Sequence, residues 1–335
     1  MSDVARLAGV SAISVSRVIN QPSKVAEATR QRVWSAIEHT GYIPNLLAGS
    51  LASSRTHTIG VIVPTVINSI FADKIQGMTD RLGAEDYHLL LASSGYSLDT
   101  EAELVAALLA QRVSGLVLTG VRHAARTRRL LKRIATPVVE TWSFGAKPID
   151  MLVGFSNEKA AYAMVHHLAR AGYRKVALVC APTPDNDRAQ GRLKGYRRAV
   201  RELGLVVDGR LERAAPFSLG NGATALVSLV EEHRDVDAIF FANDILAVGA
   251  LFECARRGWR VPDQLGIAGF DDVDLAAQTV PALTTVRIPR YDIGVKAAEL
   301  ILARLAGRVA PETMIDLGFE IIPRASTRTP KSVAD

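Results

Sequence analysis

The sequence has little of what would place a protein outside the cell interior or in a membrane. It holds only two cysteines, Cys180 and Cys254, and neither belongs to a CxxC pair or to a disulfide framework, which favours a reducing compartment. No apolar run approaches the roughly 20 residues needed to span a bilayer. The first residues lack the charged-then-apolar pattern of a secretory signal. We therefore expect a cytoplasmic protein that has no membrane partner.

Patterns typical of enzymes are also missing from the sequence. There is no GxSxG, no Walker motif, no metal-ligand spacing and no paired Cys and His, so we expect neither catalysis nor a cofactor. The neighbouring pairs Asp271-Asp272 and His166-His167 have ordinary structural interpretations. An enzyme acting on sugar acids stays as an alternative that a turnover assay would test.

The length and the charge distribution are the first positive signals. A chain of 335 residues is too long for one ordinary core, so we expect two to three compact units. Residues 1–55 carry six basic and three acidic side chains, which is half of the net charge of +6. A basic end attracts phosphate backbones, although a solvated basic surface is the simpler explanation of the charge alone.

Residues 1–40 are expected to form three short helices. Apolar residues recur on one face of each helix: Val4, Leu7 and Ala8, then Val15, Val18 and Ile19, then Val33 and Ile37. Gly9-Val10-Ser11 separates the first two helices, and Ser11 is a good N-cap for a helix that begins at Ala12. Gly41 is expected to end the third helix as its C-cap.

Two short helices joined by a glycine-containing turn are the helix-turn-helix arrangement. The residues that open the second helix would then face base edges in the major groove. Arg17 suits guanine, and the serines suit a phosphate or a base. A three-helix bundle without a role in DNA binding stays as the alternative on spacing alone. The predicted DNA-contacting residues of this part are Ser11, Ala12, Ile13, Ser14, Ser16, Arg17 and Asn20.

From residue 58 onward, apolar runs alternate with helical stretches, which predicts a parallel α/β sheet. The expected strands are Ile59–Pro64, His88–Ser93, Gly115–Thr119, Val138–Trp142, Val176–Cys180, Ala238–Ala242 and Leu265–Phe270. The expected helices include Phe71–Leu82, Thr100–Gln111, Lys159–Ala171 and Leu246–Arg257. A second start of the pattern near Lys175 predicts two similar lobes.

The residues themselves are more specific than their spacing. DVARLAGVSAISVSRVIN and VAEATRQRVWSAIEHTGYIPNLLAGSLAS resemble the DNA-binding headpiece of the LacI/GalR family. The resemblance continues through IGVIVP, LLAQRVSGLVLTG, GFSN, FFANDILAVGAL, IAGFDD and PALTTVRIP, and so covers nearly the whole chain. It implies an α/β two-lobed body, like a periplasmic binding protein, behind a small all-α helix-turn-helix DNA-binding domain at the N-terminus.

The resemblance also implies domain boundaries. They are a headpiece at 1–44, a hinge helix and linker at 45–57, and an effector-binding and dimerisation domain at 58–330. Within that domain, lobe 1 is expected at about 58–155 plus 290–316, and lobe 2 at about 156–286 plus 317–328.

In that family the segment after YIPN is a hinge helix that orders on the operator, and a leucine from each subunit wedges into the minor groove. Here the resemblance makes that leucine Leu51, with Asn45 and Ala48 on the same helix. Apolar wedges kink DNA at a cost of a few kcal/mol of unstacking. A helix this short is unstable alone, so it can act as a switch. Ala26 departs from the family pattern, which generally has a serine-like N-cap there.

Ligands of such a body bind beyond the carboxyl ends of the strands. Aromatic faces can cover the C–H side of a polyol, amide and carboxylate groups suit hydroxyls, and arginine forks suit a carboxylate or a phosphate. For any single aromatic, core packing is the alternative. By the resemblance, the pocket residues are Asn68, Ser69, Phe71, Trp142, Phe155, Arg188, Arg192, Phe217, Asn243 and Asp271.

The segments TGVRHAARTRRLL, PVVETW and KPIDMLVGFSN resemble the gluconate-operon repressor branch of the family. Two arginines, Arg188 and Arg192, also favour an acidic sugar, so gluconate or a related aldonate is the expected effector. A neutral or phosphorylated sugar, and a sugar receptor without a DNA function, stay as alternatives. The final residues, RASTRTPKSVAD, contain no heptad tail, so we expect a homodimer on a pseudo-palindromic operator rather than a tetramer.

Overall fold

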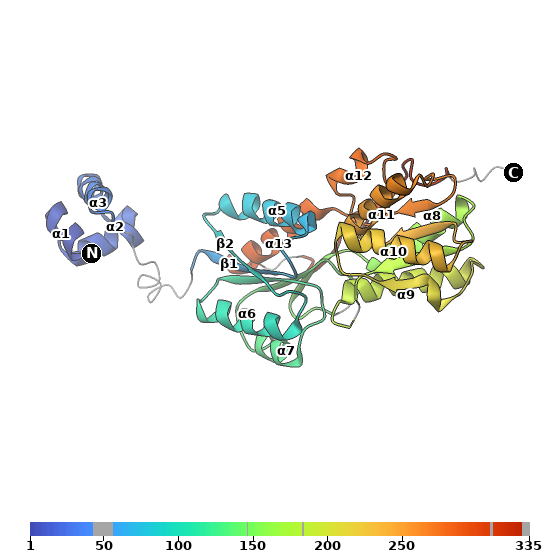
Figure 1. Cartoon of the computed structure of the whole chain (residues 1–335). Coiled ribbons are helices and arrows are strands. Elements are labelled where there is room, and N and C mark those ends of the chain that lie inside the picture. Colours follow the sequence, from blue (N-terminus) through green and yellow to red (C-terminus); the bar gives the residue numbers. More distant parts are fainter. Residues whose placement is uncertain (43–55, 146, 183, 309–310, 330–335) are drawn as a thin grey trace. The chain divides into compact units, whose positions relative to one another are not determined.

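The computed structural model describes residues 1–42, 56–145, 147–182, 184–308 and 311–329 (Figure 1). The chain divides into two compact units, Met1–His57 and Thr58–Asp335. The predicted hinge residues Asn45, Ala48 and Leu51 lie outside the described residues.

The first unit is all-helical, with α1 (Ser2–Ala8), α2 (Ala12–Asn20), the 3-10 turn η1 (Pro22–Lys24) and α3 (Glu27–Thr40). The predicted caps are confirmed. The Ser11 hydroxyl accepts the N–H of Ser14 at 3.1 Å, and Gly41 ends α3 in the left-handed region at φ 61°, where glycine carries no Cβ penalty. Ala26 gives α3 no side-chain cap, as its methyl group requires.

One expectation about this unit is wrong. Leu7 is 53% exposed, although its spacing from Val4 and Ala8 suggested one shared face. The small core that α1, α2 and α3 enclose takes Val4, Ala5 and Ala8 from α1. At 100° per residue the centre of that face lies between positions 4 and 5, so Leu7 falls at its edge.

Lobe 1 of the second unit is built on a parallel sheet with the strand order β11-β5-β4-β3-β1-β2. Its strands are β1 (Thr58–Val63), β2 (His88–Ser93), β3 (Gly115–Thr119), β4 (Val138–Thr141), β5 (Met151–Gly154) and β11 (Met314–Asp316). Its helices are η2 (Ser69–Phe71), α5 (Ala72–Gly83), α6 (Leu98–Ala110), α7 (Ala125–Leu131) and α13 (Arg290–Leu305). Figure 1 shows α5 and α13 on one face of this sheet, and α6 and α7 on the other. Because both faces of the sheet are covered, the side chains on both sides of β1, such as Val61 and Ile62, are buried.

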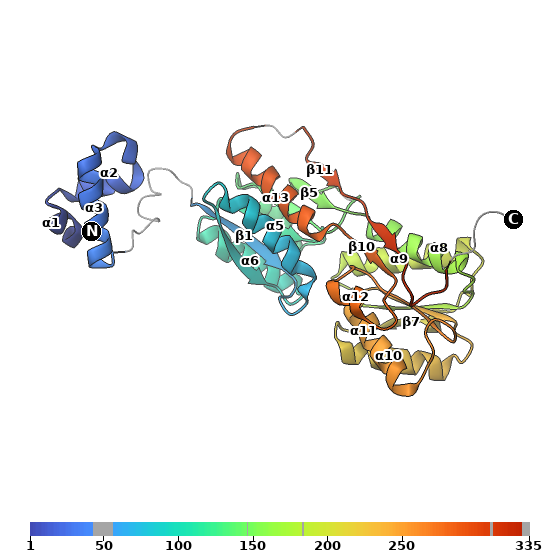
Figure 2. The same cartoon turned by 90° about the horizontal axis from the view of Figure 1, so that it is seen from above.

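Lobe 2 repeats the plan with a parallel sheet in the order β7-β6-β8-β9. Its strands are β6 (Val176–Cys180), β7 (Glu212–Ala214), β8 (Ala238–Phe241) and β9 (Gly266–Ala268). Its helices are α8 (Asn157–Arg170), α9 (Asp187–Glu202), η3 (Gly209–Leu211), α10 (Leu219–Glu232), α11 (Asp244–Arg257) and α12 (Asp274–Gln278). The antiparallel pair β10 (Thr285–Arg287) and β12 (Glu320–Ile322) belongs to the segments that connect the lobes, and Figure 2 shows β10 between them.

The predicted α/β architecture with two lobes is confirmed. The strands His88–Ser93, Gly115–Thr119 and Val176–Cys180 match the expectation to the residue, whereas Leu265–Phe270 shortens to β9. The strands β5, β7, β10, β11 and β12 were not predicted; each has only three or four residues, and unlike β4 and β8 none of them was recognised as a continuous apolar run. No helix of the described segments combines the length and the apolarity needed to cross a membrane.

Candidate functional site

The predicted DNA-contacting residues lie on α2 and immediately before it. Val15 and Val18 are fully buried against α1 and α3, and this orientation leaves Ala12, Ile13 and Arg17 exposed. Ile13 is 67% exposed. The start of α2 therefore presents an apolar and cationic face of the kind that enters a major groove.

The serines of this segment have different surroundings. Ser11 and Ser14 are joined through their hydroxyl groups at 3.0 Å, and Ser16 is half-buried. Asn20 is the last residue of α2. The first turn of α2 holds no acidic residue, so nothing there opposes the attraction between the helix N-terminus and a phosphate.

The second candidate site is a cleft between the two lobes. The carboxyl ends of β1, β3 and β4 meet those of β6 and β8 around a central cavity of about 20 Å³. Six of the ten predicted effector residues line this cavity: Phe71, Trp142, Arg188, Arg192, Phe217 and Asn243.

Arg192 on α9 is buried at the centre of the cleft, with 4% of its surface exposed. Its Nε donates to Asn157 Oδ1 at 2.9 Å, and its Nη1 donates to the carbonyl oxygen of Ala242. The guanidinium group stacks on Phe270, with 3.8 Å from Cζ to the ring centroid. Its Nη2 lies 3.8 Å from Asp271 Oδ1. Packing therefore fixes the orientation of Arg192.

Arg188, one turn earlier on α9, contacts the opposite lobe. Its Nη1 donates to the carbonyl oxygen of Thr119 at 3.1 Å and lies 3.0 Å from Asp187 Oδ1. Asp187 itself accepts hydrogen bonds from Ser143 Oγ at 2.6 Å and from the N–H of Val121 at 3.1 Å. Gly120 allows this close approach, because a Cβ there would lie 2.4 Å from Arg188 Nη1. The start of α9 thus clamps lobe 1 to lobe 2.

Asp271 does not line the cavity itself but contacts Asn243, which does, and it is completely buried. Burial raises its pKa to about 7, although the Arg192 guanidinium opposes part of that rise. Asn243 Nδ2 donates to Asp271 Oδ2, while Asn243 Oδ1 caps α11 by accepting the N–H of Ile245 at 3.1 Å. Within the described chain, Asp271 Oδ1 has no hydrogen-bond partner.

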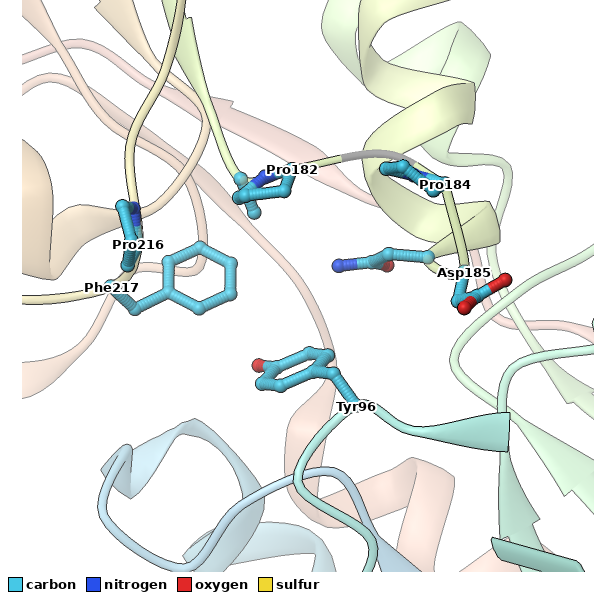
Figure 3. Close-up of a pocket in the computed structure, with 8 residues that line it drawn as sticks. Tyr96, Pro182, Pro184, Asp185, Pro216 and Phe217 are labelled. Carbon is cyan, nitrogen blue, oxygen red and sulfur yellow. The ribbon is translucent and has the colours of Figure 1, made fainter. Parts of the chain in front are cut away.

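Aromatic rings form the apolar walls of the cleft. Phe71 and Trp142 lie in contact on the lobe 1 side, with ring centroids 5.0 Å apart. At the mouth, Tyr96 faces Phe217 across the lobes at 5.8 Å, beside an apolar pocket of about 320 Å³ (Figure 3). Trp142 and Tyr96 both have a left-handed backbone, with φ of 73° and 64°. Such strain in residues other than glycine is concentrated at functional sites.

Three predicted residues lie elsewhere. Asn68 and Ser69 line a separate pocket of about 200 Å³, because the turn into η2 uses the Asn68 side chain to accept the N–H of Ile70 at 3.3 Å. Phe155 is fully buried and packs on Phe270, with ring centroids 6.2 Å apart. The position of Phe155 is that of a core residue behind the cleft.

Tyr96 and Lys74 were not among the predicted residues. Tyr96 follows β2, so the rule that placed the other residues at strand ends could have found it. Lys74 lies on α5 beneath Phe71 and Trp142, and no pattern in the sequence distinguishes it from a surface lysine. Within the described residues, no group of three or more His, Cys, Asp or Glu side chains could hold a metal ion.

Comparisons with known proteins agree with this architecture. Residues 1–45 match the family described as bacterial regulatory proteins, lacI family, and residues 165–327 match the periplasmic binding protein-like domain. The HTH-type transcriptional regulator GntR of Pseudomonas aeruginosa is 35% identical over 328 residues, which cover 98% of this chain and 95% of that protein.

Two solved structures are similar over almost their whole length. A LacI-family transcriptional regulator from Silicibacter pomeroyi has a TM-score of 0.91 and 31% identity, with 99% of each chain covered. The lac repressor dimer bound to operator and an anti-inducer has a TM-score of 0.84 and 26% identity, with 98% of each chain covered. The predicted family and fold class are confirmed, and the chain belongs to the LacI family of DNA-binding transcriptional regulators.

Proposed function

We propose that the protein represses genes for carbohydrate use and that a sugar acid such as gluconate, bound in the cleft, releases it from its operator. The observation that carries the choice of effector is the pair of buried arginines in one small cavity. Their Nη1 groups donate to backbone carbonyl oxygens, of Thr119 and Ala242. A carboxylate is a stronger acceptor for a guanidinium fork than a neutral carbonyl.

The charges around the cavity support an anionic ligand. Arg188 has Asp187 as a close partner, but Asp187 is shared with Ser143 and Val121. Among the described residues, the acidic partner of Arg192 within 4 Å is Asp271, at 3.8 Å. With a pKa of about 7, that carboxyl is charged in about half of the molecules at neutral pH. The cleft therefore carries a positive charge that a ligand carboxylate would neutralise.

The walls and the remaining polar groups suit the rest of a polyol acid. Phe71, Trp142 and Phe217 offer faces for C–H groups, and Asn243 is a polar group in the same lining. A neutral sugar would use these groups but leave the arginines on their carbonyl acceptors. A phosphorylated sugar would satisfy the arginines as well, so the thermal measurements below have to separate it from a sugar acid.

For the DNA side, we propose that two chains pair through the body and place two α2 helices on a pseudo-palindromic operator. The similar lac repressor structure is a dimer on an operator. We propose residues 1–44 as the headpiece, 45–57 as the hinge and 58–330 as the effector-binding body. Effector binding would shift the first lobes and melt the hinge helix around Leu51. Since operator DNA lies in the cytoplasm, we propose that the protein acts there.

The decisive measurement is the thermal midpoint of the purified protein with gluconate, ketogluconates, other aldonates, glucose, ribose and sugar phosphates. A ligand that binds only the folded state stabilises it by about 2.7 kcal/mol at a hundredfold excess over Kd. A rise with sugar acids alone, together with loss of operator binding in a fluorescence anisotropy assay, supports the proposal. A rise with neutral or phosphorylated sugars alone refutes the sugar acid. Turnover of any of these compounds would favour an enzyme.

Removing residues 1–57 separates a regulator from a sugar receptor. The body is a compact unit of its own, so the shortened protein is expected to keep effector binding and lose operator binding. Leu51→Gly should weaken specific operator binding and leave effector affinity unchanged. Loss of both activities in Leu51→Gly would contradict the separation of roles.

A further inference from the structure

Lys74 on α5 is a buried cation directly beneath the floor of the cleft. Its side chain has no exposed surface. Its Nζ donates to Thr119 Oγ1 at 2.9 Å and lies 3.4 Å from Thr141 Oγ1. The same Nζ lies 5.6 Å from the Phe71 ring centroid and 5.7 Å from that of Trp142, the two aromatic residues of the lobe 1 wall. One layer of aromatic side chains therefore separates this amine from the cavity.

None of the acidic groups on the surrounding described elements pairs with Lys74. Asp73, its neighbour on α5, pairs with Arg290 of α13 at 2.7 Å. Glu140 of β4 contacts His123 at 3.0 Å, and it points to the other face of the sheet because it alternates with Thr141.

The charged groups nearest to Lys74 belong to α9. Thr119 joins the two basic residues, since its hydroxyl accepts from Lys74 and its carbonyl oxygen accepts from Arg188. Burial, together with a smaller contribution from the positive charge of Arg188, lowers the pKa of Lys74 to about 7. Asp187 contacts Arg188, Ser143 and the N–H of Val121.

A buried lysine without a carboxylate partner is costly to the free protein. The hydroxyl groups that it contacts have acceptors of their own, because Thr119 Oγ1 donates to the carbonyl oxygen of Ile62 and Thr141 Oγ1 to that of Leu118. An apolar side chain would fill the site without leaving either hydroxyl unpaired. Packing alone therefore does not explain a lysine at this position.

We propose that Lys74 is a proton-linked specificity residue, which takes a proton from solvent when a carboxylate-bearing effector binds at Arg188 and Arg192. This inference rests on the proposed function, because it needs an anionic ligand. The ligand carboxylate neutralises the guanidinium charge that repels an ammonium group at Thr119. The neutral amine of Lys74 then takes up one proton and becomes an ammonium ion, and no other bond forms or breaks. A neutral sugar brings no negative charge to Arg188, so the repulsion between Arg188 and Lys74 stays and no proton is drawn.

The test is isothermal titration calorimetry of the full-length protein with sodium gluconate and with glucose. Titrations at pH 7.5 in phosphate, HEPES and Tris give the number of protons taken up, from the slope of the observed enthalpy against the buffer ionisation enthalpy. An amine with a pKa of about 7 is neutral in about three quarters of the molecules at pH 7.5, so up to about 0.8 proton is expected with gluconate. Glucose should give a slope near zero.

Variants assign the proton to its residue. Lys74→Met should reduce the uptake and weaken gluconate binding about tenfold, while Lys132→Met, an exposed lysine of the same lobe, should change neither. Asp271 also titrates near pH 7, so it can contribute to the proton uptake. The variant Asp271→Asn removes that contribution and should keep the uptake that is due to Lys74. Lys74→Gln can donate a hydrogen bond but cannot ionise, and should behave like Lys74→Met.

The dependence of affinity on pH gives a second readout that a structural role would not change. For the unmodified protein the Kd for gluconate should rise toward tenfold per pH unit between pH 7 and 8.5, with a flatter dependence in Lys74→Met. Gluconate binding without proton uptake, or uptake that is undiminished in Lys74→Met, overturns the role of Lys74 and leaves the effector unaffected. Affinity restored by Lys74→Gln overturns it too. Failure of every sugar acid to bind overturns the proposed effector and this role together.

Discussion

Replacing Lys74 by methionine should stabilise the protein, in a way that depends on pH. The lysine pKa falls from 10.5 to about 7 on folding. At about 1.4 kcal/mol per pH unit, the difference of about 3.5 corresponds to about 5 kcal/mol against the ammonium form. Between pH 7 and 10.5 the unfolded chain holds a proton that the folded protein lacks. The stability that this group controls therefore rises with pH across that window.

The balance can be worked out from the contacts. At pH 7 the ionisation penalty is about 4 kcal/mol, because about half of the folded molecules keep the proton. Methionine fills a similar volume without a polar group, but it gives up two hydrogen bonds to threonine hydroxyls, worth about 2 kcal/mol together. We expect Lys74→Met to be more stable by about 2 kcal/mol at pH 7. At pH 9 the penalty is about 2 kcal/mol and the two effects cancel.

Urea unfolding followed by tryptophan fluorescence measures this difference, because Trp142 lies beside the substituted side chain. Titrations at pH 7 and pH 9 give the free energies of unfolding for both proteins. A variant that is less stable than the unmodified protein at pH 7 would refute the reasoning. So would an advantage that is equal at the two pH values, because it would show that Lys74 folds without losing its proton.

Three further predictions concern other parts of the chain. Burial lowers the pKa of His123, but its hydrogen bonds with Glu101 and Glu140 outweigh burial and raise the pKa to about 9. The unmodified protein should therefore be more stable than His123→Gln, with the full difference below pH 6.5 and a loss of about 3 kcal/mol of it as the pH rises to 9. A difference in urea titrations that does not change with pH would contradict this. Arg192→Lys keeps the charge but loses the guanidinium fork, so gluconate should bind at least tenfold more weakly in calorimetry while operator binding persists; an unchanged Kd would remove Arg192 from the site. Removal of residues 1–57 should abolish operator binding in anisotropy assays and leave the gluconate Kd within about twofold, whereas loss of both would show that the body does not fold alone.

Arg192→Lys is a better test than Arg192→Ala for a reason that only the structure supplies. Truncation to alanine would leave the Asn157 amide oxygen and the Ala242 carbonyl oxygen without their donor, and would open space against Phe270. Buried acceptors left unpaired destabilise a protein by about 1–3 kcal/mol each. A loss of response in Arg192→Ala could then reflect unfolding instead of lost recognition.

Local patterns carried a large part of the fold. Ser11 and Gly41 mark helix ends through chemistry that involves only their neighbours in the chain, and the structure places caps at both. Doubly buried strands such as β3 and β6 are continuous apolar runs, so their bounds were predicted to the residue. The wrong expectation for Leu7 arises from tertiary packing and not from local chemistry. How much of the surface of α1 is buried depends on how its partners pack against it.

The sequence by itself determined the fold class, the family and most of the residues that gather at the cleft, because strand ends and family motifs are local properties of the chain. Only the tertiary structure showed that Phe155 is a core residue, that Asn68 faces another pocket and that Arg192 is held by Asn157 and Ala242. It alone placed Lys74 under the aromatic floor. Desolvation depends on what surrounds a side chain in space, and α5, β3, β4 and α9 come together around Lys74 only in the folded protein.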